Sequence, residues 1–359
     1  MAVLGWSQSQ LHSFRSLVLH GSELIELYSF ITSGSAYDRN HGPIPRIRRD
    51  EHRVRVDGAV SNPLSLSVHD LVTSFPQHEV VCVLQCASNR RHTMRTSLKE
   101  VDGIDWGDAA LMNCSWRGPR LCDILERAGV ARGEQDAHVG FAYEATETQN
   151  DCWYGASTEL ARALDRDNDI IVATERNSVL LSAEHGAPVR IIVPGVAGAR
   201  SVKWVDHITV QQKESSNYYQ NRDYKVLPEH VSNAQEAEGY WDTTPALQDM
   251  PVNSVVALPR CGETISAEQD GCIVVRGYAV PGGRDGPVTK VEISVDGQKT
   301  WTEATIRGSP SKCPSKGSNP TIFCRTFDKG GNEQAAKPSW NLRGVVYNGY
   351  GESRDVTVT

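Results

Sequence analysis

A cysteine at the end of an apolar run is the first residue of this sequence whose position suggests chemistry. Cys86 follows the run Val80–Leu84, and two arginines, Arg90 and Arg91, come soon after it in the stretch VVCVLQCASNRR. A strand that stops at a small polar turn delivers its last side chains to a loop, where functional residues commonly lie. Nearby guanidinium groups would stabilise the thiolate, the nucleophilic and metal-binding form of cysteine. These residues alone leave two interpretations open, a reactive thiol and an ordinary buried core thiol.

A second group of polar residues lies in the segment HGAPVRIIVPGVAGARSVKW (185–204). Arg190 and Lys203 could supply positive charge to an anion, while His185 and Ser201 could add hydrogen bonds without net charge. The same residues could equally be solvated charges and an ordinary histidine at strand ends. GVAGA alone is a weak phosphate-loop signal. An anion site and a plain loop therefore both remain open.

Five segments together resemble one family. LQCASNRR (84–91) is similar to the L-Q-C-A-G-N-R-R motif of the sulfite oxidase family of molybdenum enzymes, in which this cysteine binds molybdenum. YDRNHGPIP (37–45) resembles the family's R-N-H-x-P-x-P segment, which binds the pterin cofactor. Segment 185–204 resembles a further signature, and NRDYK (221–225) and SWNLRGV (339–345) match two more blocks in family order.

This resemblance implies a Mo-molybdopterin cofactor and assigns roles to individual residues. Cys86 is the expected metal ligand, because a soft thiolate suits a metal already held by the two dithiolene sulfurs of the pterin. Three arginines are expected to hold the substrate anion, a tyrosine to place a hydroxyl near the metal, and a tryptophan to form a wall. The residues expected at the reacting centre are Cys86, Arg39, Arg91, Tyr224, Arg343 and Trp106. Those expected to bind the pterin are Arg39, Asn40, His41, Gly42, Pro43, His185, Arg190, Ser201, Val202 and Lys203.

The sequence departs from the family pattern at three places. Ser88 stands where the family usually has glycine, so we expect a local backbone adjustment there. Ala145 stands where the family commonly has an aspartate, seven residues after His138, and Glu144 or Glu147 could replace it. A Ser/Pro/Lys-rich loop, 308–320, replaces a tryptophan-rich strand.

The elements that must position these residues form an α+β pattern over residues 1–245. A short helix is expected at 22–31, a strand at 52–58, and a helix with a capping box of Ser67 and Asp70. A second helix begins at Leu121 and is closed by Gly129. Further strands are expected in the three apolar, β-branched segments 169–174, 188–195 and 202–210.

The pattern changes in residues 246–359, where the segments become strand-like. Segments 272–280 and 321–328 read as strands, and Asp296–Gly297 is a hairpin signal. We expect an all-β, immunoglobulin-like sandwich here, which by the resemblance is the domain that makes a homodimer.

Composition excludes several classes of function. The chain has 359 residues and a net charge of −7, which argues against a general nucleic-acid binder. No apolar run approaches the ~20 residues of a membrane helix. The 9 cysteines are an odd number and contain no CxxC, which argues against a zinc-ribbon or thioredoxin site. We expect reduced, mostly buried thiols in a soluble intracellular protein. No clear targeting signal separates cytosol, mitochondrion and peroxisome.

The resemblance implies a plant-type, haem-free member that oxidises sulfite to sulfate by oxygen-atom transfer. No cytochrome b5 module is recognisable in the chain, so the electrons would pass to O2 or to a separate acceptor such as cytochrome c. The first alternative is the molybdenum domain of an assimilatory nitrate reductase, against which Arg343 argues, since nitrate reductases typically carry a hydrophobic residue there. The second is a degenerate cofactor-binding protein without activity.

Overall fold

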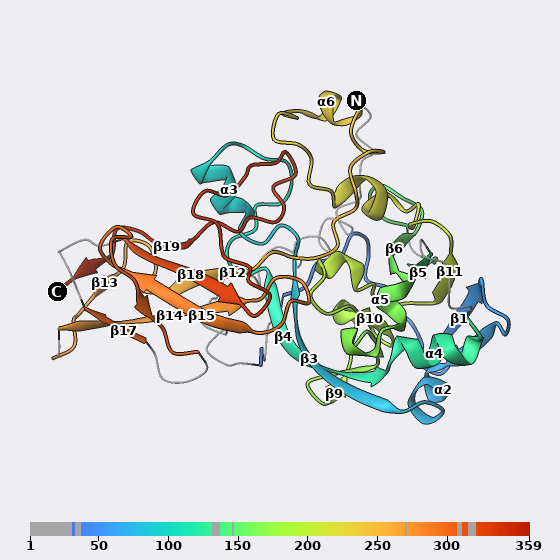
Figure 1. Cartoon of the computed structure of the whole chain (residues 1–359). Helices are drawn as coiled ribbons and strands as arrows, with labels where there is room; N and C mark the ends of the chain where they lie inside the picture. The colour runs from blue at the N-terminus through green and yellow to red at the C-terminus, as the bar shows by residue number, and fades with distance from the viewer. Residues whose placement is uncertain are drawn as a thin grey trace.

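The strands of the protein gather in two halves (Figure 1), the earlier ones in one half and those after residue 253 in the other. The computed structural model describes residues 31–32, 37–130, 137–145, 147–269, 271–306, 311–314 and 321–359, of which 311–314 are described for the backbone only. The helix expected at 22–31 falls outside these ranges except for residue 31, and so does most of the loop 308–320. The described part of the chain contains no helix that is long and apolar enough to cross a membrane.

The first half is built on a five-stranded sheet in the order β2-β1-β11-β5-β6. Its strands are β1 Arg53–Gly58, β2 Leu64–Ser67, β5 His138–Tyr143, β6 Tyr154–Glu159 and β11 His207–Gln211. The pair β1 and β11 is parallel and the other pairs are antiparallel, so the sheet is mixed. Apolar residues of this sheet share one core with helices α4 (Leu121–Ala128) and α5 (Leu160–Leu164).

The expected helix ends are confirmed. Helix α2, Val68–Thr73, begins with a complete capping box in which the amide of Asp70 donates to Ser67 Oγ at 3.1 Å and the Ser67 amide donates to the Asp70 carboxylate at 2.8 Å. Helix α4 ends at Gly129, whose φ of 71° is a left-handed conformation that glycine adopts without steric cost.

A second sheet, in the order β3-β4-β8-β9, carries the chain to Cys86. Its strands are β3 Gln77–Gln85, β4 Leu111–Pro119, β8 Glu175–Arg176 and β9 Val179–Leu180. A separate pair, β7 Ile171–Ala173 and β10 Arg190–Ile192, packs against it. β3 ends one residue before Cys86, as expected, but it is buried only near that end. Val81, in the middle of β3, is 47% exposed and lines the groove described below.

The second half contains strands and no helix among its described residues after 253. One sheet has β12 Asn253–Leu258, β14 Cys272–Val280 and β17 Ser311–Pro314, and another has β15 Val288–Ser294, β16 Thr302–Glu303, β18 Ile322–Asp328 and β19 Gly351–Ser353. β13 Thr264–Ile265 pairs with β20 Thr357–Val358. Apolar residues from both larger sheets, among them Ile273 and Ile322, form one core.

The expected hairpin forms, with β15 antiparallel to β16, but its loop is longer than a two-residue turn. Asp296 organises that loop by accepting hydrogen bonds from the backbone amides of Lys299 and Thr300 at 3.1 and 2.9 Å.

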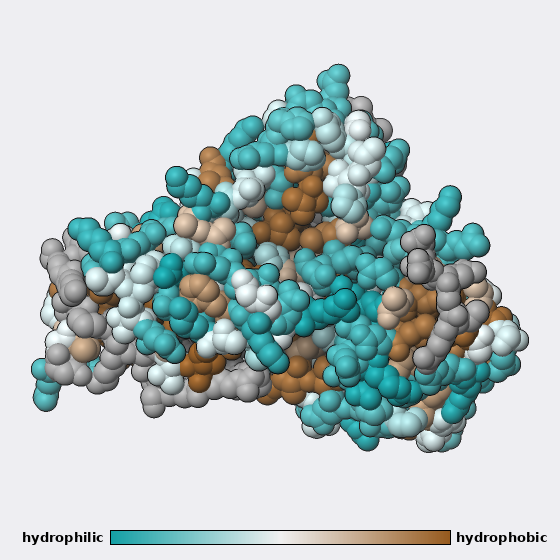
Figure 2. Space-filling view, viewed as in Figure 1, coloured by the Kyte–Doolittle hydropathy of each residue, from teal (hydrophilic) through white to brown (hydrophobic). Residues whose placement is uncertain are grey.

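Two short helices, α3 Arg91–Ser97 and α6 Ala234–Ala237, lie along the top of the molecule in Figure 1. The face shown in Figure 2 is mainly hydrophilic, and apolar residues gather in a few patches, one of them where the two halves meet. β3 and β4 on one side and β12 and β14 on the other line a groove at this junction.

Candidate functional site

Cys86 is held in a tight turn directly after β3 and is only 4% exposed. Its amide donates to the carbonyl of Ala110 at 2.9 Å, and the Asn89 amide donates back to the Cys86 carbonyl at 3.0 Å. Ser88 is buried in this turn, but its φ is not positive; the left-handed residue is Arg90, with φ of 67°. Ser88 therefore occupies this turn without a left-handed backbone.

Arg90 points away from the thiol, contrary to the expectation that both arginines flank it. Its guanidinium donates to Asn253 Oδ1 at 2.8 Å and to the carbonyls of Gly349 and Tyr350 at 2.5 and 2.8 Å. With 1% exposure, Arg90 ties the Cys86 turn to the second half of the molecule. Arg91 stays close enough to Cys86 to interact with it electrostatically.

Aromatic rings pack around the cysteine. Cys86, Trp106 and Ala110 form one buried cluster, with Tyr37 packed against it. The Tyr37 and Trp106 rings meet edge to face, with their centroids 5.5 Å apart, so Trp106 forms part of the wall as expected. Burial, reinforced by the neighbouring Cys86, raises the pKa of the Tyr37 hydroxyl well above its ordinary value. Sequence reasoning did not single out Tyr37, although it begins the quoted segment YDRNHGPIP.

One pocket gathers residues from segments far apart in the sequence. Its lining includes these expected site residues: Cys86, Arg39, Asn40, His41, Arg190, Ser201, Lys203 and Tyr224. Tyr37 and Tyr154 also line it. Tyr154 was missed by sequence reasoning; its hydroxyl donates to the Ala199 carbonyl at 2.9 Å.

A histidine and a tyrosine face each other in this pocket. His41 Nε2 and the Tyr224 hydroxyl are 2.8 Å apart, and the His41 ring stacks on Tyr154 with centroids 5.1 Å apart. Burial, reinforced by Arg39, lowers the pKa of His41 well below its ordinary value. Burial and the nearby Asp223 raise the pKa of Tyr224 well above its ordinary value. At neutral pH the imidazole is therefore neutral and the phenol keeps its proton.

Two cations lie on the opposite part of the lining. The Arg190 guanidinium donates to the carbonyls of His185 and Ser201 at 2.9 and 3.0 Å. Its Nε is buried and has no hydrogen-bond partner among the described residues. Lys203 Nζ donates to Asn40 Oδ1 at 2.6 Å.

Burial and neighbouring positive charges lower the pKa values of both cations. Burial lowers the pKa of Arg190 to about 10. Burial followed by the charge of Arg190 lowers the pKa of Lys203 well below its ordinary value. Two like charges taken out of water are unfavourable without a counter-ion, so this corner of the pocket suits an anionic group.

Glycines allow the backbone to bring these groups together. Gly186, with φ of 103°, follows the 3₁₀ turn Ala183–His185, and a Cβ on it would come within 3.0 Å of Lys203 Cβ and 3.1 Å of Arg190 Cβ. Gly198 begins the turn Gly198–Arg200, and a Cβ there would lie 3.0 Å from the carbonyl of Gln85, the residue before Cys86.

Other expected cofactor residues lie behind the lining. His185 is buried, with Nδ1 2.8 Å from Ser182 Oγ and Nε2 3.1 Å from a nitrogen of Arg176, a cation that sequence reasoning missed. Val202 is buried as well. Gly42 packs so closely that a Cβ would come within 2.6 Å of the Glu147 carbonyl, and Pro43 follows it without lining the pocket.

Of the three expected substrate arginines, Arg39 lines this pocket, and Arg91 and Arg343 lie outside its lining. Arg39 lines the pocket and donates to the Asn40 carbonyl. Arg91 lies outside the lining and donates to the carbonyls of Ile104 at 3.0 Å and Arg343 at 2.7 Å. Arg343 forms an ion pair with Asp223, a further residue that sequence reasoning missed although it precedes Tyr224 in NRDYK. The backbone carbonyl of Arg343 thus accepts a hydrogen bond from Arg91, while the Arg343 side chain pairs with Asp223.

Neither glutamate near Ala145 reaches the pocket lining. Glu144 pairs with Arg55 and lies 2.8 Å from His207 Nδ1, at the edge of the first sheet. Glu147 meets the site only through its backbone, at Gly42.

Comparison with known proteins identifies the family. Residues 41–219 match the oxidoreductase molybdopterin-binding domain, and residues 244–317 match the Mo-co oxidoreductase dimerisation domain. The sulfite oxidase of Gallus gallus is 37% identical over 335 residues, which cover 86% of this chain and 69% of that protein. The chain belongs to the sulfite oxidase family of molybdopterin oxidoreductases.

Other members of the family show its breadth. The mitochondrial sulfite oxidase of Rattus norvegicus is 38% identical, over 90% of this chain and 61% of its own length. The nitrate reductase [NADH] of Volvox carteri is 36% identical, over 90% of this chain and 40% of its own length. The chain therefore spans 61% and 40% of the length of these two relatives, less than two thirds of each. The crystal structure of the sulfane dehydrogenase SoxCD from Paracoccus pantotrophus superposes with a TM-score of 0.71 at 25% identity, covering 90% of this chain and 83% of that one.

Proposed function

We propose that this protein oxidises sulfite to sulfate at a molybdenum centre. The observation that carries the proposal is the single pocket in which Cys86 lies together with Arg39, Tyr224 and the buried pair Arg190 and Lys203. A soft metal ligand, a proton-bearing phenol and a site for an anion are the parts that such a reaction needs in one place. The sulfite oxidase relatives named above support the choice of substrate.

The residues present fit a molybdopterin. Arg190 and Lys203 would hold its phosphate, because they are buried cations and the Arg190 Nε has no partner among the described residues. Cys86 would bind the metal as a single protein ligand: the described residues include no group of three or more His, Cys, Asp or Glu side chains that could hold a metal ion. The backbone around Asn40, His41, Gly42 and Pro43 and that of Ser201 and Val202 would shape the pterin site, with His185 behind it.

When bound, the cofactor supplies oxygen-atom transfer and takes up two electrons. The chain's own groups then have distinct tasks. The Tyr224 hydroxyl keeps its proton and donates it in a hydrogen bond to the substrate oxygen, and the neutral His41 orients that hydroxyl from 2.8 Å. Arg39, with Arg91 and Arg343 behind it, provides the positive field that draws in the anion. Trp106 and Tyr37 cover Cys86 and exclude water from its sulfur.

We extend the proposal to the whole molecule. We assign residues 1–245 to the catalytic domain and 246–359 to an immunoglobulin-like sandwich through which two copies form a homodimer. The match to a dimerisation domain supports this assignment. O2 or cytochrome c would accept the electrons. The free cysteines of the described side chains support an intracellular location.

A steady-state assay tests the reaction. We expect sulfite-dependent reduction of oxygen, ferricyanide or cytochrome c, and no reduction of nitrate by a reduced viologen. Brisk nitrate reduction without sulfite oxidation would replace the proposal with the nitrate reductase alternative. Preparations that carry neither molybdenum nor pterin after expression in a cofactor-competent host would favour a degenerate protein.

The Cys86→Ser variant tests the site. We expect the purified variant to keep its fold and its pterin, measured by circular dichroism and by pterin fluorescence after release, because the pterin contacts lie on other segments. Sulfite oxidation should be almost completely lost. Cys272→Ser, on β14 in the second half, is the matched control and should behave as the parent protein. Normal turnover in Cys86→Ser would refute the metal assignment.

A further inference from the structure

We propose that Cys82 and Cys114 form a redox-sensitive cysteine pair that closes into a disulfide between β3 and β4, just before the turn that carries Cys86. The two residues lie directly opposite each other in the antiparallel ladder of these strands. Directly opposite residues have Cα atoms about 4.5 to 5.5 Å apart and project their side chains from the same face of the sheet. Disulfides span Cα separations of about 4.4 to 6.8 Å. The register therefore already brings the thiols within bridging range.

Packing keeps both side chains on that shared face. Cys114 belongs to the buried cluster that includes Leu84, Trp116 and Ile192, and Cys82 packs against the same cluster. The two thiols are close enough to interact electrostatically. Both are free in this structure, so the reduced state is the one described here.

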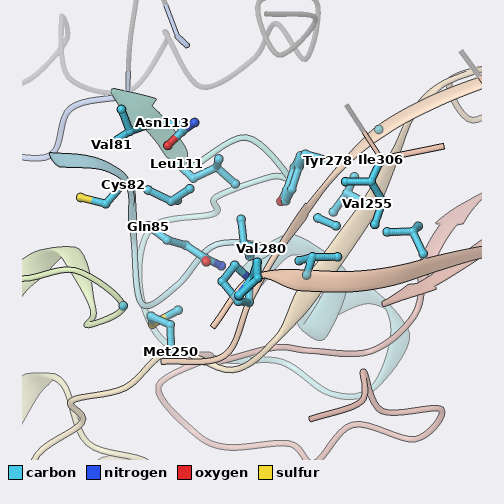
Figure 3. Close-up of a pocket in the computed structure, with 18 of the residues that line it drawn as sticks. Val81, Cys82, Gln85, Leu111, Asn113, Met250, Val255, Tyr278, Val280 and Ile306 are labelled. Carbon is cyan, nitrogen blue, oxygen red and sulfur yellow. The ribbon is translucent and has the colours of Figure 1, made fainter. Parts of the chain in front are cut away.

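The two cysteines differ in access to solvent. Cys82 is half-buried and lies on the wall of the groove between the two halves, with Val81 and Gln85 of its own strand and Asn113 of β4 nearby (Figure 3). Cys114 is fully buried. The Cys82 sulfur points away from Gln85 and Leu111 (Figure 3), but Cys82 is the less buried of the two cysteines, so a small oxidant meets it first and Cys114 acts as the resolving thiol.

The chemistry needs a two-electron oxidant, for which a hydroperoxide suffices. The Cys82 thiolate attacks the peroxide, so an S–O bond forms, the O–O bond breaks, and one water leaves after protonation. The Cys114 thiolate then attacks the resulting sulfenic sulfur, forming the S–S bond and releasing a second water. Two thiols lose two electrons and two protons, and one hydrogen peroxide becomes two waters.

The surroundings of the two thiols make the oxidation slow at neutral pH. They also connect the cysteine pair to the proposed cofactor pocket. Burial raises the pKa of Cys82 to about 12. Burial also raises the pKa of Cys114, although Arg176 and Arg190 oppose the effect. Arg190 interacts with both thiols and also lines the proposed cofactor pocket. Oxidation would thus convert two thiols beside Arg190 into a disulfide. This change would take place on β3 and β4, of which β3 leads to Cys86.

Peptide mapping of the full-length protein tests the inference, without requiring catalytic activity. Reduced protein is treated with hydrogen peroxide at pH 7, 8 and 9, alkylated, digested without reductant and analysed by mass spectrometry. We expect a cross-linked peptide pair containing Cys82 and Cys114, forming about tenfold faster per pH unit because only the thiolate attacks. Exposed Cys152 and Cys261 report that the oxidant has acted.

Three variants separate the outcomes. Cys82→Ser and Cys114→Ser should each abolish the cross-link, and Cys272→Ser should leave it unchanged. The release of pterin on dilution, compared before and after oxidation, shows whether the bridge alters the Arg190 corner of the pocket. Complete oxidation of Cys152 and Cys261 with Cys82 and Cys114 still unbridged would overturn the proposal.

Discussion

At the scale of single residues, the ion pair between Arg343 and Asp223 allows the effect of substituting Arg343 on sulfite binding to be predicted. Arg343→Met removes a fixed positive charge and leaves Asp223 half-buried without its partner. The lost charge weakens the positive field that draws in the anion, so we expect the KM for sulfite to rise about tenfold, which corresponds to about 1.4 kcal/mol. Steady-state kinetics measure this, with Arg354→Met, which removes an exposed pair with Glu352, as the control. Unchanged KM and kcat would remove the main reason for preferring sulfite to nitrate.

The site residues that the sequence predicted lie in recognisable motifs, whereas those that it missed take their roles from contacts with distant segments. Cys86, Arg190 and Lys203 stand in motifs whose residue types suggest their chemistry. Tyr37 and Asp223 act through partners distant in the sequence, and pattern alone does not specify which side chains meet in space. Their adjacency to motif residues was the one available signal. Arg90 was misjudged because its hydrogen-bond acceptors lie 163 to 260 residues later in the chain, where no local pattern points to them.

At the scale of elements, Gly186 tests whether backbone geometry holds the anion corner. We expect Gly186→Ala to lower the free energy of unfolding by about 1 to 3 kcal/mol and to reduce pterin content, because the new Cβ would press on Lys203 and Arg190. Gly262→Ala is a close control: its φ of 72° is also left-handed, but nothing lies within 4 Å of its Cβ. Urea unfolding and released-pterin fluorescence measure both effects. Equal pterin loss in the two variants would show that strain alone, not contact with the cations, is responsible.

Asp206, at the start of β11, makes stability depend on pH. Burial raises the pKa of Asp206 to about 6 from an ordinary value of 3.8, and the charge of Glu144 also raises it. The hydrogen bond from the Glu144 amide and the nearby Arg55 and His207 act in the opposite direction and lower it. A raised carboxyl pKa means that the folded state binds the proton more tightly than the unfolded state. This contribution to stability is therefore complete below about pH 4 and is lost as the pH rises through about 6.

Substitution of Asp206 checks the sign. Between pH 4 and 6 this carboxyl should cause the urea midpoint of the parent protein to decline as the pH rises. We expect that decline to be smaller in Asp206→Asn, and we expect this variant to be more stable than the parent at pH 7. The amide oxygen can still accept from Glu144. A decline of the same steepness in the variant would show that another group titrates there.

The elements themselves were predictable wherever local signals are strong. The capping box of Ser67 and the glycine stop at position 129 need only a few neighbouring residues, and both formed as expected. The strand expected over 202–210 begins only at His207, because Lys203 is used in the site and Trp204 has a left-handed φ of 57°. The start of this strand depends on tertiary contacts, which cannot be predicted from the β-branched residues of the segment.

At the scale of the whole molecule, Arg90 fastens the two halves together. Arg90→Met would leave the Tyr350 carbonyl without its buried donor, while Asn253 Oδ1 and the Gly349 carbonyl would each lose one hydrogen bond and keep another from Gln334. We expect the free energy of unfolding to fall by about 3 kcal/mol, since an unsatisfied buried group costs about 1 to 3 kcal/mol and each of the other lost hydrogen bonds about 0.5 to 1.5 kcal/mol. Urea unfolding followed by tryptophan fluorescence measures this, with Arg354→Met changing it by less than about 1 kcal/mol. A change of similar size in both variants would contradict the fastening role.

The long reach of Arg90 also bears on how the protein is made. Its carbonyl acceptors at Gly349 and Tyr350 come 259 and 260 residues later in the chain. A ribosome that adds about 5 to 20 residues per second needs about 13 to 50 seconds to supply them. Throughout that interval the Cys86 turn lacks the contacts that tie it to the second half of the molecule. We therefore expect the cofactor to enter a completed chain after its release, and not a nascent chain during translation.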